Sequence, residues 1–250
     1  MTWTPTRPPG GPGRHRDQPA KAGDGTVEMI RSLRLARRSA VKARTQAANQ
    51  LKALLVTAPD VLRAQLRRLP PAELVTTAAR LRPATKPATP TDAAKLALRS
   101  IARRWLQLTQ EITALDTQLE RLVAMAAPAL VAVNGVGTQT AAVLLVAAGD
   151  NPERLRSEAA FAQLCGVAPI PAASGKTTRH RLNRGGNQEA NRALYLIAVG
   201  RMAWHGPTHT DVERRTKQGK SKAEIIRCLK RHIARELYGI LVSRPPLDEP

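Results

Sequence analysis

The stretch IARRWLQLTQEITALDTQLERLVA, from Ile101 to Ala124, carries the clearest periodicity in this chain. Its large apolar side chains recur at alternating intervals of four and three residues, which is the heptad spacing of a helix that packs along a single seam. The seam consists of Ile101, Trp105, Leu108, Ile112, Leu115, Leu119 and Leu122. Three heptads are marginal for an isolated coiled coil, so this helix needs a partner. The partner is either the preceding basic helix, folded back, or a second subunit, which would make the protein a homo-oligomer through residues 101–122.

Composition points to a helical fold around this seam. The chain has 250 residues, enough for one or two domains with buried cores, yet aromatic residues make up only 2% of it. The core must therefore be built from Ala, Leu and Val, which favours helices over strands. We predict a mainly α fold, in which long helices with a coiled-coil segment are followed by a helical C-terminal domain.

The charge of the chain is strongly one-sided. Forty Lys and Arg against nineteen Asp and Glu give a formal net charge of +21. Such an excess predicts a polyanionic partner, and Arg in particular favours bidentate contacts to phosphate. No apolar run approaches the roughly 18 residues of a membrane helix, and the N-terminus lacks the apolar segment of a signal peptide. We therefore predict a cytoplasmic, nucleoid-associated protein that binds DNA or RNA and no membrane.

The two cysteines do not indicate a metal site. Cys165 and Cys228 are isolated, and neither has the spacing of Cys and His ligands. We predict structural roles for both thiols and no metal-binding residues in this chain.

Proline and charge divide the chain into three parts. Residues 1–25 are rich in Pro, Gly and charge, which predicts a disordered basic tail. Residues 26–126 are predicted as a basic helical and coiled-coil region, interrupted by a Pro-rich linker near residues 83–91. Residues 127–245 have a different texture and are predicted as a C-terminal domain that contains a serine loop.

Cations gather on the first and last predicted helices. The first, from Thr26 to about Val56, carries a basic stripe that includes Arg34, Arg37 and Arg38. Its one-sided charge favours phosphate contact, and a merely solvated face is the alternative. The last helix, about Ser221–Val242, is predicted to bury Ile226, Leu229, Ile233, Leu237 and Ile240 on one face. Its other face is predicted to carry Lys222, Arg227, Lys230, Arg231 and Arg235.

The segment Asn134-Gly135-Val136-Gly137 lies between two apolar helical stretches. This arrangement is typical of a helix-hairpin-helix, in which glycines permit a tight turn and the next helix directs its first N–H groups toward a phosphate. Gly135, Gly137 and Thr138 are therefore candidates for contact with the DNA backbone. A simple connection between two helices is the alternative.

A second candidate site is the loop SGKTTRHRLNRGGNQEANRALY, from Ser174 to Tyr195. Ser174 is the candidate nucleophile for phosphoryl transfer, because glycines allow close approach of a phosphate and cations stabilise the charge that develops on it. The candidate nucleic-acid-binding residues are Gly175, Lys176, Arg179, Arg181, Arg184, Gly185 and Asn187. The loop lacks the spacing of a Walker motif, and a structural serine is the alternative to a catalytic one.

The phrase FAQLCGVAPIPAASGKTTRHRLNRGGNQEANRALYLIA, preceded by the GVG turn and an Ala-rich helix, resembles a known family. It looks like the C-terminal domain, called transposase family 20, of the insertion sequence 110/116/902 family of transposases. The resemblance covers about Pro128 to Val242. The basic segment from about Ala22 through Val56 also resembles the part of that family that leads into its coiled coil.

The resemblance implies a bacterial DNA recombinase that acts in transposition of an insertion sequence. Members of the family pair this C-terminal domain with an N-terminal RuvC-like nuclease domain, whose DEDD carboxylates bind Mg²⁺. A serine of the C-terminal domain is thought to attack the DNA phosphate, and an RNA encoded by the element guides site choice. Carried onto this sequence, the serine is Ser174, Gly135 and Gly137 match the hairpin, and the loop framework is Gly175, Gly185 and Asn187.

This chain departs from the family before the basic helix, where the RuvC-like domain is expected. Asp17 and Asp24 stand in a Pro/Gly/Arg-rich segment without a strand pattern, whereas metal chemistry needs carboxylates on a fixed scaffold. We therefore expect an N-terminally truncated transposase. It would hold no cofactor of its own, and Mg²⁺ would enter only with a RuvC-like domain supplied from elsewhere. A non-catalytic remnant that still binds nucleic acid is the alternative.

The charge predicts a salt-dependent affinity for nucleic acid. Each phosphate contact releases counterions, so binding of duplex DNA should weaken by about 10³-fold or more between 50 and 200 mM salt if six or more contacts form. Fluorescence anisotropy with a labelled duplex across this range measures the slope. A slope near zero would contradict a phosphate-dominated surface.

Overall fold

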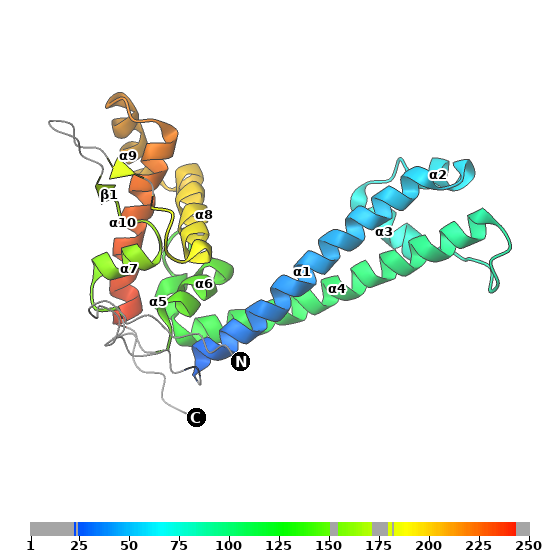
Figure 1. Cartoon of the computed structure of the whole chain (residues 1–250), viewed down its shortest axis with the longest axis horizontal. Coiled ribbons are helices and arrows are strands. Elements are labelled where there is room, and N and C mark those ends of the chain that lie inside the picture. The colour runs from blue at the N-terminus through cyan, green and yellow to red at the C-terminus, as the bar shows by residue number, and fades with distance from the viewer. Residues whose placement is uncertain (1–22, 24, 151–154, 172–179, 182, 244–250) are drawn as a thin grey trace, which may run out of the picture. The chain divides into compact units, whose positions relative to one another are not determined.

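The computed structural model describes residues 23, 25–150, 155–171, 180–181 and 183–243 (Figure 1). In these ranges the chain forms ten α-helices and one pair of two-residue strands, so the predicted mainly α fold is confirmed. The elements are α1 (Thr26–Thr57), α2 (Asp60–Leu66), α3 (Pro71–Ala79), α4 (Pro90–Ala126), α5 (Pro128–Val131), α6 (Thr138–Ala148), α7 (Glu158–Leu164), β1 (Ile170–Pro171), β2 (His180–Arg181), α8 (Gln188–Trp204), α9 (Gly206–Lys217) and α10 (Lys222–Val242). None of the described helices combines the length and apolarity that would let it span a membrane.

The chain divides into two compact units, and each is described by itself. One unit, which we call the arm, contains residues 29–132 and 137–142. The other, which we call the C-terminal unit, is built mainly from residues 143–250 and also includes residues 133–136.

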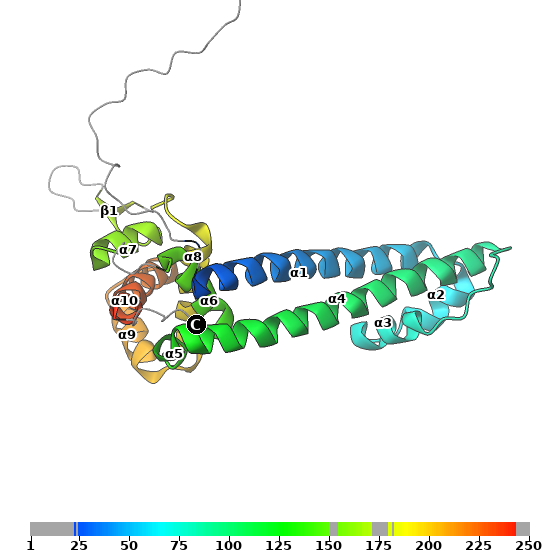
Figure 2. The ribbon, with the colours of Figure 1, turned by 90° about the horizontal axis from the view of Figure 1, so that it is seen from below.

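The arm is a hairpin of two long helices. α1 and α4 run side by side in opposite directions (Figure 2). Asp116 accepts hydrogen bonds from Arg37, and the Arg44 guanidinium lies over the Trp105 ring, 5.6 Å from its centroid. The helix that carries the heptad seam therefore has its partner helix in the same chain, which is one of the two alternatives left open by the sequence. Coiled-coil supercoiling and homo-oligomerisation stay predictions.

Two short helices pack at one end of the arm. α2 and α3 each begin after a proline, Pro59 and Pro70, because proline fixes the φ angle of a first turn and cannot continue the preceding helix. Together with the end of α1 and the start of α4 they bury one apolar cluster. Its members are Leu51, Leu55, Ala58, Leu62, Leu66, Leu74, Val75, Ala78, Ala79, Ala94, Leu98 and Ala102. We call residues 51–104, which contain this cluster, the arm head.

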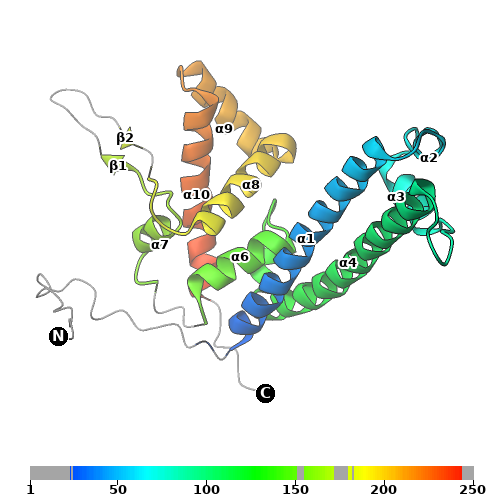
Figure 3. The same ribbon diagram turned by 45° about the vertical axis from the view of Figure 1, so that its right-hand side comes forward.

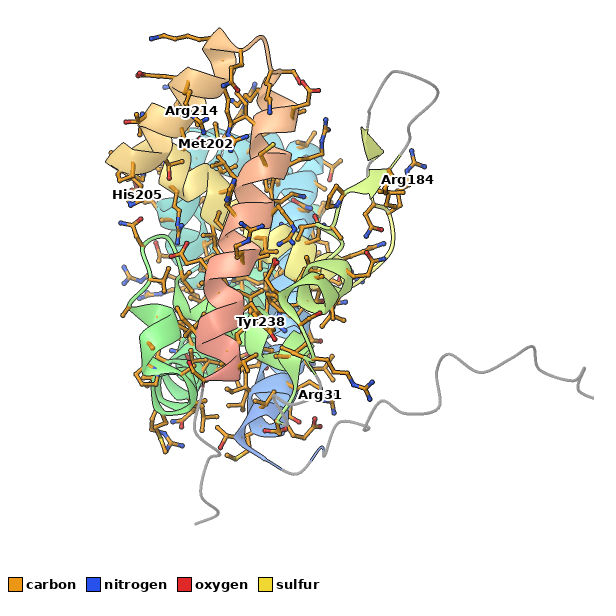
Figure 4. All side chains as sticks on the ribbon, turned by 90° about the vertical axis from the view of Figure 1, so that its left-hand side faces the viewer. Arg31, Arg184, Met202, His205, Arg214 and Tyr238 are labelled. Carbon is orange, nitrogen blue, oxygen red and sulfur yellow. The ribbon has the colours of Figure 1, made fainter. Side chains whose placement is uncertain are left out.

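In the C-terminal unit, α10 packs against α7, α8 and α9 (Figure 3). Phe161 of α7 and Leu237 of α10 are fully buried in its core. The hydroxyl of Tyr238 (Figure 4) donates a hydrogen bond to the Leu155 carbonyl oxygen at 2.9 Å. The Tyr238 ring lies 6.3 Å from that of Phe161, between centroids. The strands β1 and β2 stand between α7 and α8 in the chain.

The predicted faces of the last helix need a correction. Ile225 is buried and Ile226 is only half-buried, and Lys230 lies on the buried face rather than with the outer cations. The reason is that α10 contacts three helices, so its buried face is wider than the single apolar stripe that the periodicity suggested. The other buried residues of α10 are Leu229, Ile233, Ala234, Leu237 and Leu241.

Substituting Leu98 tests the packing of the arm head. Leu98 is fully buried, so Leu98→Ala should lower the free energy of unfolding of the arm by about 2–5 kcal/mol through the cavity it leaves. Urea denaturation followed by circular dichroism measures this loss. Leu96→Ala, two residues away with 39% of Leu96 exposed, is the matched control and should cost far less. Equal losses in the two variants would contradict the described core.

Candidate nucleic-acid interface

A two-residue ladder closes the base of the predicted serine loop. β1 pairs antiparallel with β2, so that Ile170 lies opposite Arg181 and Pro171 lies opposite His180. Pro171 and His180, which flank residues 172–179 in the chain, are thus paired. Ser174, Gly175, Lys176 and Arg179 belong to that segment and lie outside the described residues. Their predicted roles, and that of the Arg181 side chain, stay predictions.

The glycines after β2 have a packing role. Gly186 has a φ of 83°, and a Cβ atom there would lie only 2.6 Å from the Leu164 carbonyl oxygen. A Cβ on Gly166 would likewise collide with the Gly185 carbonyl oxygen. The end of α7 and the loop before α8 can therefore approach this closely only because both sides lack side chains. The Gly185 N–H donates to the Asn183 side-chain oxygen at 2.9 Å, which tightens the same loop.

Asn187 begins α8. Its side-chain oxygen accepts hydrogen bonds from the backbone N–H groups of Glu189 and Ala190, both at 3.0 Å, as the N-cap of a helix does. Its own N–H donates to the Leu164 carbonyl oxygen at 2.6 Å. Asn187 and Gly185 therefore have structural roles here, and their contact with nucleic acid stays a prediction.

Two residues that were not predicted as site residues stabilise this junction through hydrogen bonds. They are Asn191 and Lys230. The Asn191 amide nitrogen donates to the carbonyl oxygens of Cys165 and Gly166, each at 2.9 Å. Its amide oxygen accepts a hydrogen bond from the Lys230 ammonium at 2.9 Å. Burial, together with the nearby charge of Arg227, lowers the pKa of Lys230. Lys230 was predicted on the cationic face of the last helix, although it lies four residues after Ile226 and three before Ile233, and that spacing was the available signal.

Cations lie on two further parts of the C-terminal unit. Arg184 is exposed beside the hairpin base (Figure 4), and the turn between α9 and α10 carries a further group. That group consists of Arg214, Arg215, Lys217, Lys220 and Lys222. Within it, burial would raise the pKa of Asp211, but hydrogen bonds from Arg215 and Arg214 outweigh burial and lower that pKa. One carboxylate thus offsets part of the positive charge, and most of the turn stays cationic.

The predicted helix-hairpin-helix turn lies between α5 and α6. Gly135 has a φ of 79°, and a Cβ atom there would meet the Arg201 Cγ at 3.1 Å. Arg201 donates from Nε to the Asn134 carbonyl oxygen at 2.8 Å and pairs through both terminal nitrogens with Glu236. This buried arginine therefore pins the turn to α10.

The space around Gly137 is open. A Cβ atom there would have no atom within 4 Å, so packing does not require glycine at this position. Its carbonyl oxygen accepts a hydrogen bond from the Thr140 hydroxyl at 2.8 Å, in the first turn of the helix that begins at Thr138. Contact of Gly135, Gly137 and Thr138 with DNA stays a prediction.

The three predicted arginines of α1 differ in their surroundings. Arg37 donates to both carboxylate oxygens of Asp116, which offsets its charge. Arg34 is half-buried and Arg38 is exposed.

Cys165 is buried, and burial raises the pKa of its thiol to about 12, whereas Cys228 is only half-buried. The predicted structural role therefore fits Cys165 best.

The fold and the site together define a basic, mainly helical protein with a short hairpin anchored between two helices. Residues 127–213, from the start of α5 into α9, match the Transposase IS116/IS110/IS902 family. This match contains the glycine turn and the whole serine loop. Residues 127–213 are therefore similar to this transposase family, which confirms the resemblance stated from the sequence for these residues.

Two curated proteins are similar to this chain. It is 30% identical over 145 residues to the "Insertion element IS110 uncharacterized 43.6 kDa protein" of Streptomyces coelicolor, covering 57% of this chain and 36% of that protein. It is 29% identical over 156 residues to the "Pilin gene-inverting protein" of Moraxella bovis, covering 59% of this chain and 47% of that protein. The matched part of the chain thus corresponds to less than half of either relative.

Asn191 offers a test of the junction. Asn191→Ala leaves the Lys230 ammonium and two backbone carbonyls without their partner, so the free energy of unfolding should fall by about 1–3 kcal/mol. The same change should speed iodoacetamide labelling of the Cys165 thiol, measured by mass spectrometry in a Cys228→Ser background. Arg192→Ala, an exposed neighbour on α8, is the control. Unchanged labelling of Cys165 in the Asn191 variant would contradict this role.

Proposed function

We propose that this chain is a transposase of an insertion sequence and acts in DNA recombination by serine-mediated phosphoryl transfer at Ser174. The observation that carries the proposal is the family match over residues 127–213, which includes Ser174, the β1–β2 ladder, α7 and α8. The Moraxella relative is named for inverting the pilin gene, and inversion of a gene is a rearrangement of DNA. The chain spans 36% and 47% of the two relatives, so the proposal concerns the part of the reaction that this region serves.

The proposed step is an exchange of one phosphodiester for another. The Ser174 oxygen attacks the phosphorus atom of DNA, a bond from this oxygen to phosphorus forms, and the bond from phosphorus to a sugar oxygen breaks. The serine proton passes to a general base, and the departing sugar oxygen takes up a proton. Lys176, Arg179 and Arg184 are the proposed cations for the charge that develops on the phosphoryl group.

The anchoring of the hairpin supports this proposal. A nucleophile acts efficiently when supporting residues fix its position relative to the substrate. Here the β1–β2 ladder pairs the residues that flank residues 172–179, the part of the serine loop that contains Ser174. The segments before β1 and after β2 are in turn joined to α7, α8 and α10 by the contacts of Gly166, Gly186 and Asn191. A loop used only for general phosphate attraction would not need so many specific contacts.

We assign no metal ligand to this region. Over the described residues, no group of three or more His, Cys, Asp or Glu side chains is placed to hold a metal ion. We propose that Mg²⁺ enters the reaction only with a RuvC-like domain. An element-encoded guide RNA and a homo-oligomer are further proposed partners.

The competing function is nucleic-acid binding without strand chemistry. The specific observation in its favour is the large excess of Lys and Arg, since phosphate attraction needs cations and no nucleophile. The two functions give the same binding behaviour and differ only in whether a covalent step follows.

Ser174→Ala separates these two functions. With end-labelled element DNA, Mg²⁺, the cognate RNA and a RuvC-like domain added in trans, the wild-type chain should form a covalent protein–DNA adduct that survives SDS electrophoresis. The Ser174→Ala variant should form none, a loss of at least about 10³-fold, while its DNA affinity stays within about twofold.

The matched control is Ser100→Ala, which removes an exposed serine hydroxyl from α4 and should leave adduct formation unchanged. If the wild-type chain forms no adduct under these conditions but binds DNA, the non-catalytic function holds. If Ser174→Ala retains the adduct, another nucleophile carries the reaction.

A further inference from the structure

The arm head carries a groove that the proposed chemistry does not use. It lies where the end of α1 meets α2 and the start of α3, and its volume is about 420 Å³. This volume lies within the range of about 300–1,000 Å³ that is typical of small-ligand sites. The lining residues are Lys52, Leu55, Val56, Arg63, Arg67, Leu69, Pro71 and Leu74. We call this feature the head groove.

The charged lining of the head groove is entirely positive. Lys52 and Arg67 are exposed, and neither makes an ion pair within the described ranges. The Arg63 guanidinium is held across the groove, because it donates to the Val56 carbonyl oxygen at 3.3 Å and pairs with Asp60. Two cations of the groove are therefore available to an anionic ligand, and a third stands in a fixed position.

The surroundings of the groove have the same sign. The arm head contains eleven Lys and Arg against three Asp and Glu. Arg63 is the only one of these eleven with an ion pair among the residues that the structure describes. The charge thus extends well beyond the groove, which favours an extended polyanion over a small anion.

The rest of the lining is apolar. Leu55 and Leu74 are buried beneath it, and Val56 is 69% exposed at its edge. A phosphate alone would make no favourable contact with this apolar surface. A nucleotide presents both features together, a charged phosphate and the apolar face of a base. In a duplex that face is covered by stacking, so only an unpaired nucleotide can offer it.

From this juxtaposition we infer that the head groove binds an unpaired nucleotide of a single-stranded or looped nucleic acid. Lys52 and Arg67 hold its phosphate, and the base lies against Val56 and the leucines of the groove. The inference rests on the proposed function only in that the chain acts on nucleic acid. It gives the arm a binding site for unpaired strands that is independent of Ser174.

Charge variants of the full chain test the phosphate contact. Lys52→Gln/Arg67→Gln should weaken binding of a 12-nucleotide single strand about tenfold or more, measured by fluorescence anisotropy. Arg82→Gln/Lys86→Gln removes two exposed cations of the same arm head that do not line the groove, and should weaken binding less than about threefold. Single-stranded DNA and RNA of the same sequence, tested in parallel, distinguish the two sources of the strand. Equal losses of affinity in the two variants would show that the groove cations contribute only general electrostatic attraction, and would overturn the inference.

Abasic strands test the contact with the base. The wild-type chain should bind an intact single strand at least about fivefold more tightly than a strand of the same length with abasic sites. Val56→Ser should reduce this preference, whereas Val61→Ser, a control on α2 with 73% of Val61 exposed, should not. Equal affinity of the wild type for intact and abasic strands would overturn the inference.

Two further measurements separate this site from other possibilities. An acidic amphipathic peptide that displaces the single strand at a lower concentration than unlabelled single strand does would identify the groove as a peptide site and overturn the inference. Ser174→Ala should bind the single strand as the wild type does. Loss of adduct formation and loss of single-strand binding are therefore seen in different variants.

Discussion

The C-terminal unit depends on one polar contact, the bond between the Lys230 ammonium and the Asn191 amide. Lys230 is only 8% exposed as a residue, a charged ammonium is costly to bury, and the Asn191 amide oxygen accepts its hydrogen bond. The amide nitrogen of the same side chain binds two carbonyl oxygens at the end of α7. One asparagine therefore joins α7, α8 and α10, and the base of the serine loop is set by this junction. A buried polar contact of this kind fixes position, because an alternative packing would leave its donors and acceptors unpaired.

Periodicity and composition were enough to predict the helical fold. The heptad spacing of Ile101 to Leu122 identified α4, and the absence of Pro and Gly from Thr26 onward identified α1. The partner of the seam could not be chosen from the sequence, since a folded-back helix and a second subunit need the same apolar residues. The error on α10 has a related cause. A single-helix projection assumes one buried stripe, and a helix with neighbours on three sides buries polar residues such as Lys230 as well.

The candidate site was only partly predictable. Glycines in the serine loop were assigned to phosphate approach, and at Gly186 the described reason is instead the close passage of the α7 carboxyl end. Both explanations require the same residue, so sequence alone does not separate them. Asn187 is predicted as a nucleic-acid contact of the loop, whereas its role as a helix cap follows from contacts made only in the folded chain. Arg201 was missed because an arginine within a helix gives no sign that it will pin a distant turn.

The layout of the arm has a consequence for how it folds. Contacts near its head join residues close in sequence, such as Arg103 with Ala79, 24 positions apart. Further along, Arg104 and Gln50 are 54 positions apart, and Arg37 and Asp116 are 79 apart. The entropy lost on closing a loop grows with its length, and each contact formed shortens the loop that the next contact must close. We therefore expect the two long helices to pair from the head onward, with the short helices α2 and α3 forming first.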